Sequence, residues 1–129
     1  MNQDGEDESI GQIVDAGLGQ GLVRLLRYKN PRVQAAAVRA LGNLVSGDDE
    51  RHTQSVLDCG ALPSLLTVLQ SSHHLWETRS DICWMLSNIA VGSLEQIQLL
   101  IDSGLIPTLV RLLEETLART LPRGPTLPN

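Results

Sequence analysis

Three short stretches of this chain resemble one another and recur at a nearly constant spacing. Each stretch has two apolar residues, then Asp-x-Gly, then four further residues and a five-residue segment rich in Leu and Val. The aspartates are Asp15, Asp58 and Asp102, so the period is 43 and then 44 residues. Such a period predicts repeated helical units, because one unit cannot bury its apolar face alone and must stack on its neighbours.

The glycine of each Asp-x-Gly unit predicts a break between two helices. Gly17, Gly60 and Gly104 can adopt the left-handed conformation that ends a helix. A second helix is expected directly afterwards, and Pro63 and Pro107 fall in its first turn, where a missing N–H is tolerated. The predicted second helices are Gly19–Arg27, Leu62–Gln70 and Ile106–Ala118.

Two of the three units continue into a longer third helix. These helices are expected over Pro31–Val45, where Asn30 precedes the first proline, and over about Trp76–Val91. The third unit lacks one, because the last eight residues hold three prolines and a glycine. The apolar residues expected on the inner side of the third helices are Val33, Ala36, Ala37, Ala40, Leu41 and Leu44, and Ile82, Cys83, Met85, Leu86 and Ile89.

The period lies in the range of about 40–47 residues that armadillo and HEAT repeats share, so it predicts an all-α fold. The fold that we expect is a right-handed α-solenoid of armadillo repeats, with about two and two-thirds repeats. The core must come from Leu, Ile, Val and Ala, because the chain has no Phe and only two Trp. The expected organisation is an acidic flexible N-terminus over 1–8, an armadillo-repeat domain over 9–118 and a Pro-rich disordered tail over 119–129. Within the domain the repeats are expected at about 9–47, 48–92 and, in part, 93–118.

Composition disfavours several classes of function. The net charge of -5 disfavours nucleic-acid binding, which needs a basic face, and favours basic partners. No apolar run approaches the roughly 18 residues of a membrane span, so no membrane association is predicted. Two cysteines in a chain without a secretory signal indicate reduced thiols and an intracellular protein.

Three weaker patterns point to other chemistry, and a structural interpretation is favoured for each. His73 and His74, taken with His52 and the cysteines, fit no zinc-finger spacing. The glycines at 17, 19 and 21 follow a predicted helix rather than a strand, which disfavours a dinucleotide-binding loop. Cys83 lacks an evident acid or base partner and is interpreted as a packed core thiol rather than a nucleophile. We expect no enzyme activity, no metal and no cofactor.

The third helices of the first two units share a polar position. At an offset of 45 residues, Arg39 aligns with Trp84 and Asn43 with Asn88, which puts a large side chain and an asparagine on one face of each helix. A row of asparagines could hold the backbone of an extended peptide, and tryptophan could pack on Lys or Arg. For a single asparagine the alternative is a solvated polar residue. Trp76, near the start of its helix, is interpreted as a packing residue between repeats.

The stretch from Asp81 to Gly92 closely resembles the Trp-x-x-x-Asn helix of the importin alpha family, adaptors for nuclear-import signals. The stretch from Val38 to Glu50 resembles the same helix with Arg in place of Trp, as in one inner repeat near that family's minor signal-binding site. The similarity covers roughly residues 13 to 113. It implies that the chain corresponds to the sixth and seventh repeats and the start of the eighth.

By matching position, the resemblance implies a role for each residue on this face. Trp84 would stack on a basic side chain, and Asp81 would pair with a neighbouring cation. Asn43 and Asn88 would hold the peptide backbone, while Arg39 would close the site on one side.

The resemblance also implies a pocket at the end of the first long helix. Ser46, Gly47 and Asp49 would line the pocket of a Lys or Arg, and Ser87 belongs to the second motif and is a further candidate. The loop after Asp49 is one residue longer than the family spacing, which leaves Thr53 in doubt as a pocket residue. Binding of basic nuclear localisation signal peptides, in the cytoplasm and nucleus, is the implied function.

Departures from the family leave an alternative open. The chain has no basic N-terminal arm, so no importin beta binding is expected, and the helix that completes the minor site is replaced by the Pro-rich tail. A generic armadillo scaffold, or a truncated and competing fragment without cargo binding of its own, is the alternative. Self-association is expected through the unpaired face of the last helices, at Ile106, Leu109, Leu112 and Leu113.

Overall fold

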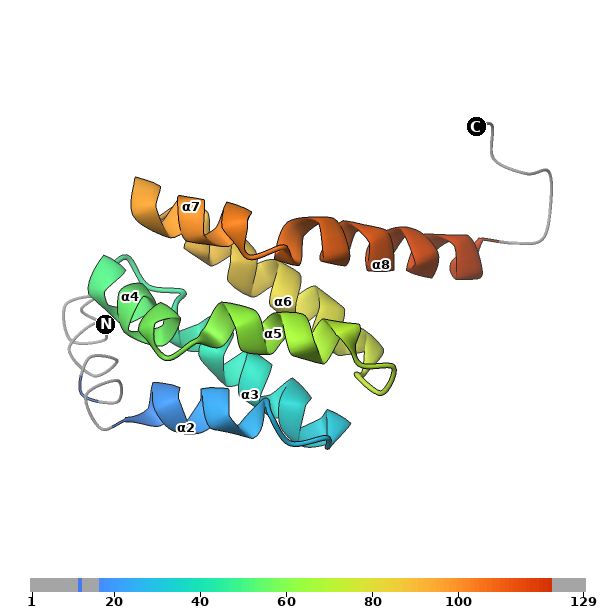
Figure 1. Cartoon of the computed structure of the whole chain (residues 1–129), viewed down its shortest axis with the longest axis horizontal. Helices are drawn as coiled ribbons and strands as arrows, with labels where there is room; N and C mark the ends of the chain where they lie inside the picture. Colours follow the sequence, from blue (N-terminus) through green and yellow to red (C-terminus); the bar gives the residue numbers. More distant parts are fainter. Residues whose placement is uncertain (1–11, 13–16, 122–129) are drawn as a thin grey trace, which may run out of the picture.

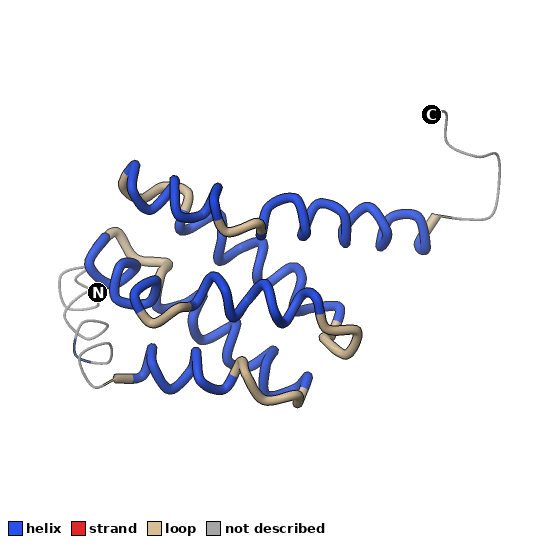
Figure 2. The backbone as a smooth tube through the Cα atoms, in the orientation of Figure 1, coloured by secondary structure: helices blue, strands red, loops and turns tan. Residues whose placement is uncertain are grey.

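All regular structure in the described part of the chain is α-helical, as the repeat predicts (Figure 2). The computed structural model describes Gln12 and residues 17–121. The first helix of the first repeat, the acidic stretch 1–8 and residues 122–129 of the predicted tail lie outside the described residues. The described helices are α2 (Leu18–Leu25), α3 (Pro31–Leu44), α4 (Glu50–Asp58), α5 (Ala61–Gln70), α6 (Trp76–Ile89), α7 (Leu94–Asp102) and α8 (Leu105–Thr120).

The helices are arranged in layers. The second helices of the three units, α2, α5 and α8, lie one above another in Figure 1, and the third helices α3 and α6 lie behind them. Helix α3 packs on α2 within its own unit and on α6 of the next unit, while α8 packs on both α5 and α6. Each unit therefore contacts its neighbours in a stack, which is the arrangement of a helical-repeat protein.

The predicted glycine turns are confirmed. Gly17, Gly60 and Gly104 have φ angles of 85°, 83° and 77°, and each stands directly before a second helix. Side chains with a Cβ rarely adopt this conformation, so glycine at positions 60 and 104 sets the angle between first and second helix in the second and third units.

The helix bounds differ from the predicted ones by a few residues. Helix α2 ends at Leu25, two residues early, and α6 ends at Ile89, also two residues early. Helix α8 continues to Thr120, because after Pro107 in its first turn the next proline is Pro122. Among the described residues no single helix is long and apolar enough to cross a membrane; α7 and α8 meet those criteria only as a pair, and the pair bends by 57°.

The core lies between the layers of helices. Val38 and Leu41 of α3, Leu65 of α5 and Ile82 of α6 are fully buried. The interpretation of Ala36 and Cys83 as inner residues is wrong, because both are exposed. At 100° per residue they lie roughly 120° or more from the centre of the buried stripe of their helices.

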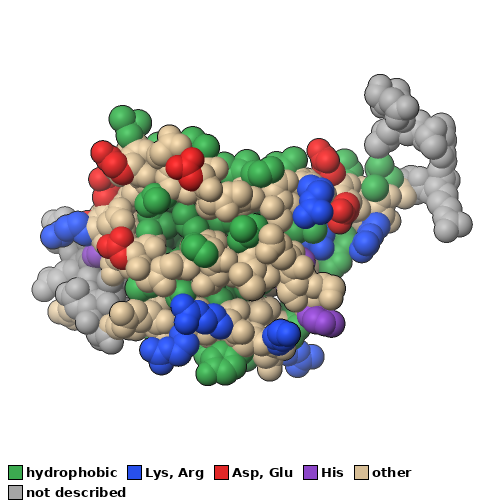
Figure 3. Space-filling model, in the orientation of Figure 1, with side chains coloured by type: hydrophobic (Ala, Val, Ile, Leu, Met, Phe, Trp, Pro, Cys, Tyr) green, Lys and Arg blue, Asp and Glu red, His purple; other side chains and the backbone are tan. Residues whose placement is uncertain are grey.

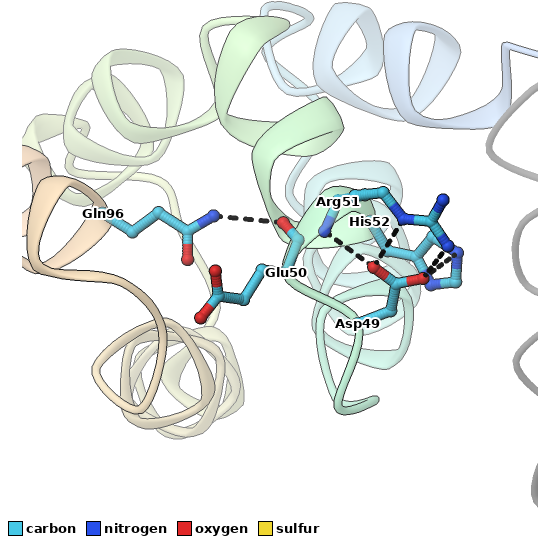
Figure 4. Close-up of polar contacts among 5 residues, drawn as sticks. All are labelled: Asp49, Glu50, Arg51, His52 and Gln96. Atoms are coloured by element: carbon cyan, nitrogen blue, oxygen red, sulfur yellow. Dashed lines mark hydrogen bonds and ion pairs between the residues drawn. The ribbon is translucent and has the colours of Figure 1, made fainter.

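Gln96 joins the second and third units. Its side chain accepts from the backbone N of Ser93 at 3.2 Å while the Ser93 hydroxyl accepts from the backbone N of Gln96, which caps α7. Its Nε2 donates to the carbonyl of Glu50 at 3.1 Å, at the start of α4 (Figure 4). The same atom also donates to Gln54 Oε1 at 3.2 Å. A Cβ at Gly92 would collide with Gln96 Oε1, so this polar link requires glycine there.

Arg79 joins α6 to α8. It donates to His74 Nε2 at 2.9 Å, to the carbonyl of Leu112 at 3.1 Å and to Thr116 Oγ1 at 2.7 Å. Its guanidinium also lies 5.6 Å from the ring centroid of Trp76. Trp76 is exposed, and its contact with Arg79 lies within its own helix.

Candidate functional site

The outward faces of α3 and α6 carry the residues that the sequence singled out. The two helices pack side by side along the stack. Arg39 and Asn43 of α3 and Trp84 of α6 are exposed, while Asp81 and Asn88 are half-buried beside them. The structure therefore brings these five side chains onto neighbouring helices, as the offset of 45 residues predicts. We call them, together with Gly42, the α3–α6 face.

The indole of Trp84 rests against the backbone of α3. A Cβ on Gly42 would lie 2.6 Å from Trp84 Cζ3 and 2.9 Å from Cε3, closer than two carbon atoms can approach. The rest of the ring is open, and 42% of the side chain's surface is exposed. Glycine at position 42 thus lets α3 support one part of the ring while another part remains available to a ligand.

An ion pair crosses from one third helix to the other. Arg39 Nη2 lies 3.5 Å from Asp81 Oδ2. The arginine side chain is 67% exposed, so water and salt screen this pair and its net stabilisation is about 0–1 kcal/mol. Asp81 Oδ2 itself is buried and has no hydrogen-bond donor among the described residues. A cation that reached it from solution would therefore meet an under-coordinated carboxylate.

The two asparagines differ in their surroundings. Asn43 is exposed, whereas the Asn88 Nδ2 atom is buried and has no hydrogen-bond partner in the described part of the chain. The Ser87 hydroxyl donates to the Trp84 carbonyl at 2.6 Å, and the Ser46 hydroxyl donates to the Asn43 carbonyl at 2.7 Å. Both hydroxyl oxygens are exposed and keep free lone pairs, so they can accept a hydrogen bond but have already used their proton.

Asp49 caps the N-terminus of α4 and is bonded within its own helix turn (Figure 4). Its carboxylate accepts from the backbone N of Arg51 at 2.9 Å and from Arg51 Nε and Nη2 at 3.1 and 2.8 Å. His52 Nε2 lies 3.6 Å from the same carboxylate. Gly47 is half-buried nearby, and Thr53 is buried within α4. The Asp49 carboxylate, expected to receive an incoming Lys or Arg, is thus already bonded to an exposed arginine of the chain itself.

The Arg51 contacts lower the pKa of Asp49 from 3.8 to about 2, first through the side-chain hydrogen bonds and then through the backbone N–H. Because the folded-state pKa lies below the ordinary value, Asp49 stabilises the fold above pH 3.8, and this contribution is lost as the pH falls towards about 2. We expect Arg51→Ala to raise the pKa of Asp49 towards 3.8, measured by carboxyl-carbon NMR titration. Arg32→Ala, far from this turn, serves as the control, and an unmodified chain whose Asp49 titrates near 3.8 would contradict the prediction.

Other polar groups of the described chain do not form a site of comparable organisation. Two adjoining hollows between α2 and α4 share Gln20, Asp58 and Cys59 in their linings, away from the α3–α6 face. Among the described residues no three His, Cys, Asp or Glu side chains are placed to hold a metal ion. Sequence reasoning missed Gly42, although its alignment with Ser87 of the second motif marks it as part of the same face.

Comparison with known proteins identifies the repeat and its relatives. Residues 6–46 match the Armadillo/beta-catenin-like repeat. The chain is 40% identical over 107 residues, 83% of its length, to Importin subunit alpha-1a of Oryza sativa subsp. japonica. It is 34% identical over 81% of its length to Probable importin subunit alpha-A of Dictyostelium discoideum. The matched regions are 20% and 18% of these two relatives, so the chain spans about a fifth of their length.

Solved structures share the fold. An engineered protein superimposes with a TM-score of 0.76 at 38% identity, over 84% of this chain and 43% of that one. A designed armadillo repeat protein in complex with the peptide (KR)4 superimposes with a TM-score of 0.74 at 36% identity, over 84% of this chain and 44% of that one. The predicted α-solenoid of armadillo repeats is confirmed.

Proposed function

The chain is built of armadillo repeats similar to those of importin alpha subunits, and we propose that its α3–α6 face binds extended peptides rich in Lys and Arg, such as nuclear localisation signals. The observation that carries this proposal is the setting of Trp84. Its ring is braced on Gly42 and otherwise open, next to the half-buried carboxylate of Asp81. A cationic side chain lying across that ring could direct its head towards the carboxylate.

The asparagines supply the complementary contacts to peptide backbone. An extended peptide presents alternating N–H and C=O groups, and an asparagine amide can donate to one and accept from another. The unpartnered Nδ2 of Asn88 suits this role, since a buried amide without a partner costs about 1–3 kcal/mol that a bound carbonyl would offset. A solved designed armadillo protein of the same fold carries a peptide of Lys and Arg, which supports the choice of ligand.

Isothermal titration calorimetry with a Lys/Arg-rich peptide tests the proposal. We expect a Kd of tens of micromolar, about 6–7 kcal/mol, because only two third helices contribute. Trp84→Ala should weaken binding about two- to thirtyfold, which corresponds to roughly 0.5–2 kcal/mol for a cation–π contact, and Asn88→Ala should weaken it about as much. Trp76→Ala is the matched control, because it removes an equally exposed indole from the start of the same helix.

Two outcomes decide against the proposal. One is unchanged affinity in both Trp84→Ala and Asn88→Ala. The other is equal binding of a peptide in which glutamine replaces every Lys and Arg. If the proposal holds, the chain would work with basic cargo in the cytoplasm and nucleus, as a nuclear-import adaptor module does.

The alternative, a scaffold without cargo binding of its own, is favoured by one observation. Both acids of the expected site are already paired with arginines of this chain, Asp81 with Arg39 and Asp49 with Arg51. Arg39→Ala separates the two functions. If the face binds basic peptides, freeing Asp81 should strengthen binding severalfold; if the chain is a scaffold, neither the parent nor this variant should bind.

A further inference from the structure

Each second helix carries two apolar rows. The glycines before α2, α5 and α8 align these helices residue by residue. We call the first row A and the second row B. In α5 both rows are largely buried, because the first and third units lie on either side of this helix. In α5 row A is Ala61, Leu65 and Val68, and row B is Leu62, Leu66 and Leu69.

At the start of the stack, row A is uncovered. Leu25 of α2 is 39% exposed, whereas Val68 at the equivalent position of α5 is 1% exposed. Leu18 is exposed as well, while its equivalent Ala61 is buried. Row B of α2, by contrast, is buried at Val23 and Leu26. Row A of α2 is therefore more open to solvent than row A of α5.

At the other end of the stack, row B is uncovered. Leu113 of α8 is 37% exposed, whereas Leu69 at the equivalent position of α5 is 2% exposed. Ile106 and Val110 are exposed too, and Leu117 extends the row along the same face of the longer helix. The expectation that Leu109 and Leu112 belong to the exposed face is wrong, because they lie in row A and are buried in the core, where α8 packs on α5.

Row A of α2 and row B of α8 are therefore equivalent to the two surfaces that already pack against each other inside the stack. Within the stack, Leu66 of row B in α5 comes within 3.9 Å of where a Cβ on Gly104 would lie, at the start of α8. We propose that a second copy of this chain docks head to tail, with row A of its α2 on row B of α8 of the first copy. This contact repeats the internal packing of one second helix on the next.

Charge favours the same pairing. Residues 17–47 contain five Arg or Lys and no Asp or Glu, whereas residues 93–121 contain four Asp or Glu and two Arg. Lys and Arg side chains gather along the α2 edge, whereas Asp and Glu side chains lie over α7 and α8, with basic side chains among them on α8 (Figure 3). Arg27, two residues after α2, and Glu114 of α8 occupy equivalent positions, whereas Arg24 of α2 is equivalent to Arg111 of α8. The complementarity therefore lies in the net charges of the two ends, positive over 17–47 and negative over 93–121, which favour head-to-tail stacking over pairing of like ends.

The contact does not close on itself. Each copy docked head to tail still has a free row A at one end of the assembly and a free row B at the other, so growth is open-ended. The inference is independent of peptide binding, because the rows lie on α2 and α8 and not on α3 and α6.

Analytical ultracentrifugation of the full chain and two variants tests this arrangement. The unmodified chain should increase in mean mass with concentration without stopping at the dimer. Leu25→Glu blocks row A and Leu113→Glu blocks row B, so each variant alone should remain monomeric. Mixed in equal amounts, they should form a dimer that grows no further, because one intact row A meets one intact row B. Both substitutions fall at exposed positions, and circular dichroism checks that the variants keep the helical content of the parent.

Three results would overturn the proposal. A parent chain that stays monomeric up to millimolar concentration has no such contact. If the Leu25→Glu variant alone still dimerises, row B of one copy packs on row B of another, and the contact is tail to tail rather than head to tail. A mixture of the two variants that stays monomeric lacks the head-to-tail complementarity. Ile106→Glu and Leu18→Glu repeat the design at neighbouring positions of the same rows.

Discussion

Leu65→Ala is expected to lower the free energy of unfolding by about 3–5 kcal/mol, the range for a fully enclosed leucine. Leu65 is 0% exposed and lies in the central unit, which has neighbours on both sides. Total stabilities of small domains are about 5–15 kcal/mol, so this single change should remove a large share and lower Tm by 10 °C or more. Urea unfolding followed by circular dichroism measures the loss.

The repeat supplies matched controls for this experiment. Leu22 and Leu109 occupy the same position as Leu65 in the first and third units, but Leu22 is only half-buried and Leu109 is covered by one neighbouring unit. We expect the loss to decrease from Leu65→Ala to Leu109→Ala to Leu22→Ala, the last at about 1–2 kcal/mol. The comparison requires a concentration at which the chain is monomeric. Equal losses at all three positions would mean that the ends are as well packed as the centre.

The local features of the fold could be predicted from the sequence because they depend on single residues. Gly60 has a positive φ because its place between two helices demands it, and Asn30 starts α3 because its side chain accepts from two backbone N–H groups at 3.2 Å. Neither feature depends on how the units are rotated against one another. Periodicity also located the centre of each buried stripe, at Leu41 and Ile82, but not its edges, where Ala36 and Cys83 proved to be exposed.

The contacts between units could not be predicted in the same way. The Arg39–Asp81 pair joins residues that are 42 positions apart and depends on the rotation of α6 against α3. The engagement of Asp49 by Arg51 depends on the rotamer of a long side chain at the first turn of α4. The offset between the third helices predicted which side chains share a face, but it did not predict that Asp81 and Asp49 are paired within the chain. Physically, such pairings are decided by small differences between solvation and Coulomb energies.

Gly42→Ala is expected to move the Trp84 ring off α3. Alanine would normally stabilise a helix interior by about 0.5–1 kcal/mol relative to glycine. Here the new Cβ would lie 2.6 Å from the ring, so the indole must swing outwards and lose its packing on the helix. The gain and the loss should nearly cancel in the free energy of unfolding, while the emission of Trp84 shifts to longer wavelength. A Trp76→Phe background makes Trp84 the only tryptophan in the chain.

Gly21→Ala is the matched control, because nothing lies within 4 Å of the Cβ that it would add in α2. Gly21→Ala should raise the free energy of unfolding by about 0.5–1 kcal/mol, the whole gain expected from replacing glycine with alanine. In a Trp84→Ala background, Gly42→Ala should become as stabilising as Gly21→Ala, and this double-mutant cycle isolates the contact between ring and helix. If Gly42→Ala stabilises the parent as much as Gly21→Ala does, the ring does not rest on α3. The bracing that we infer for peptide binding would then be absent, because an indole free to rotate cannot hold a cationic side chain in one orientation.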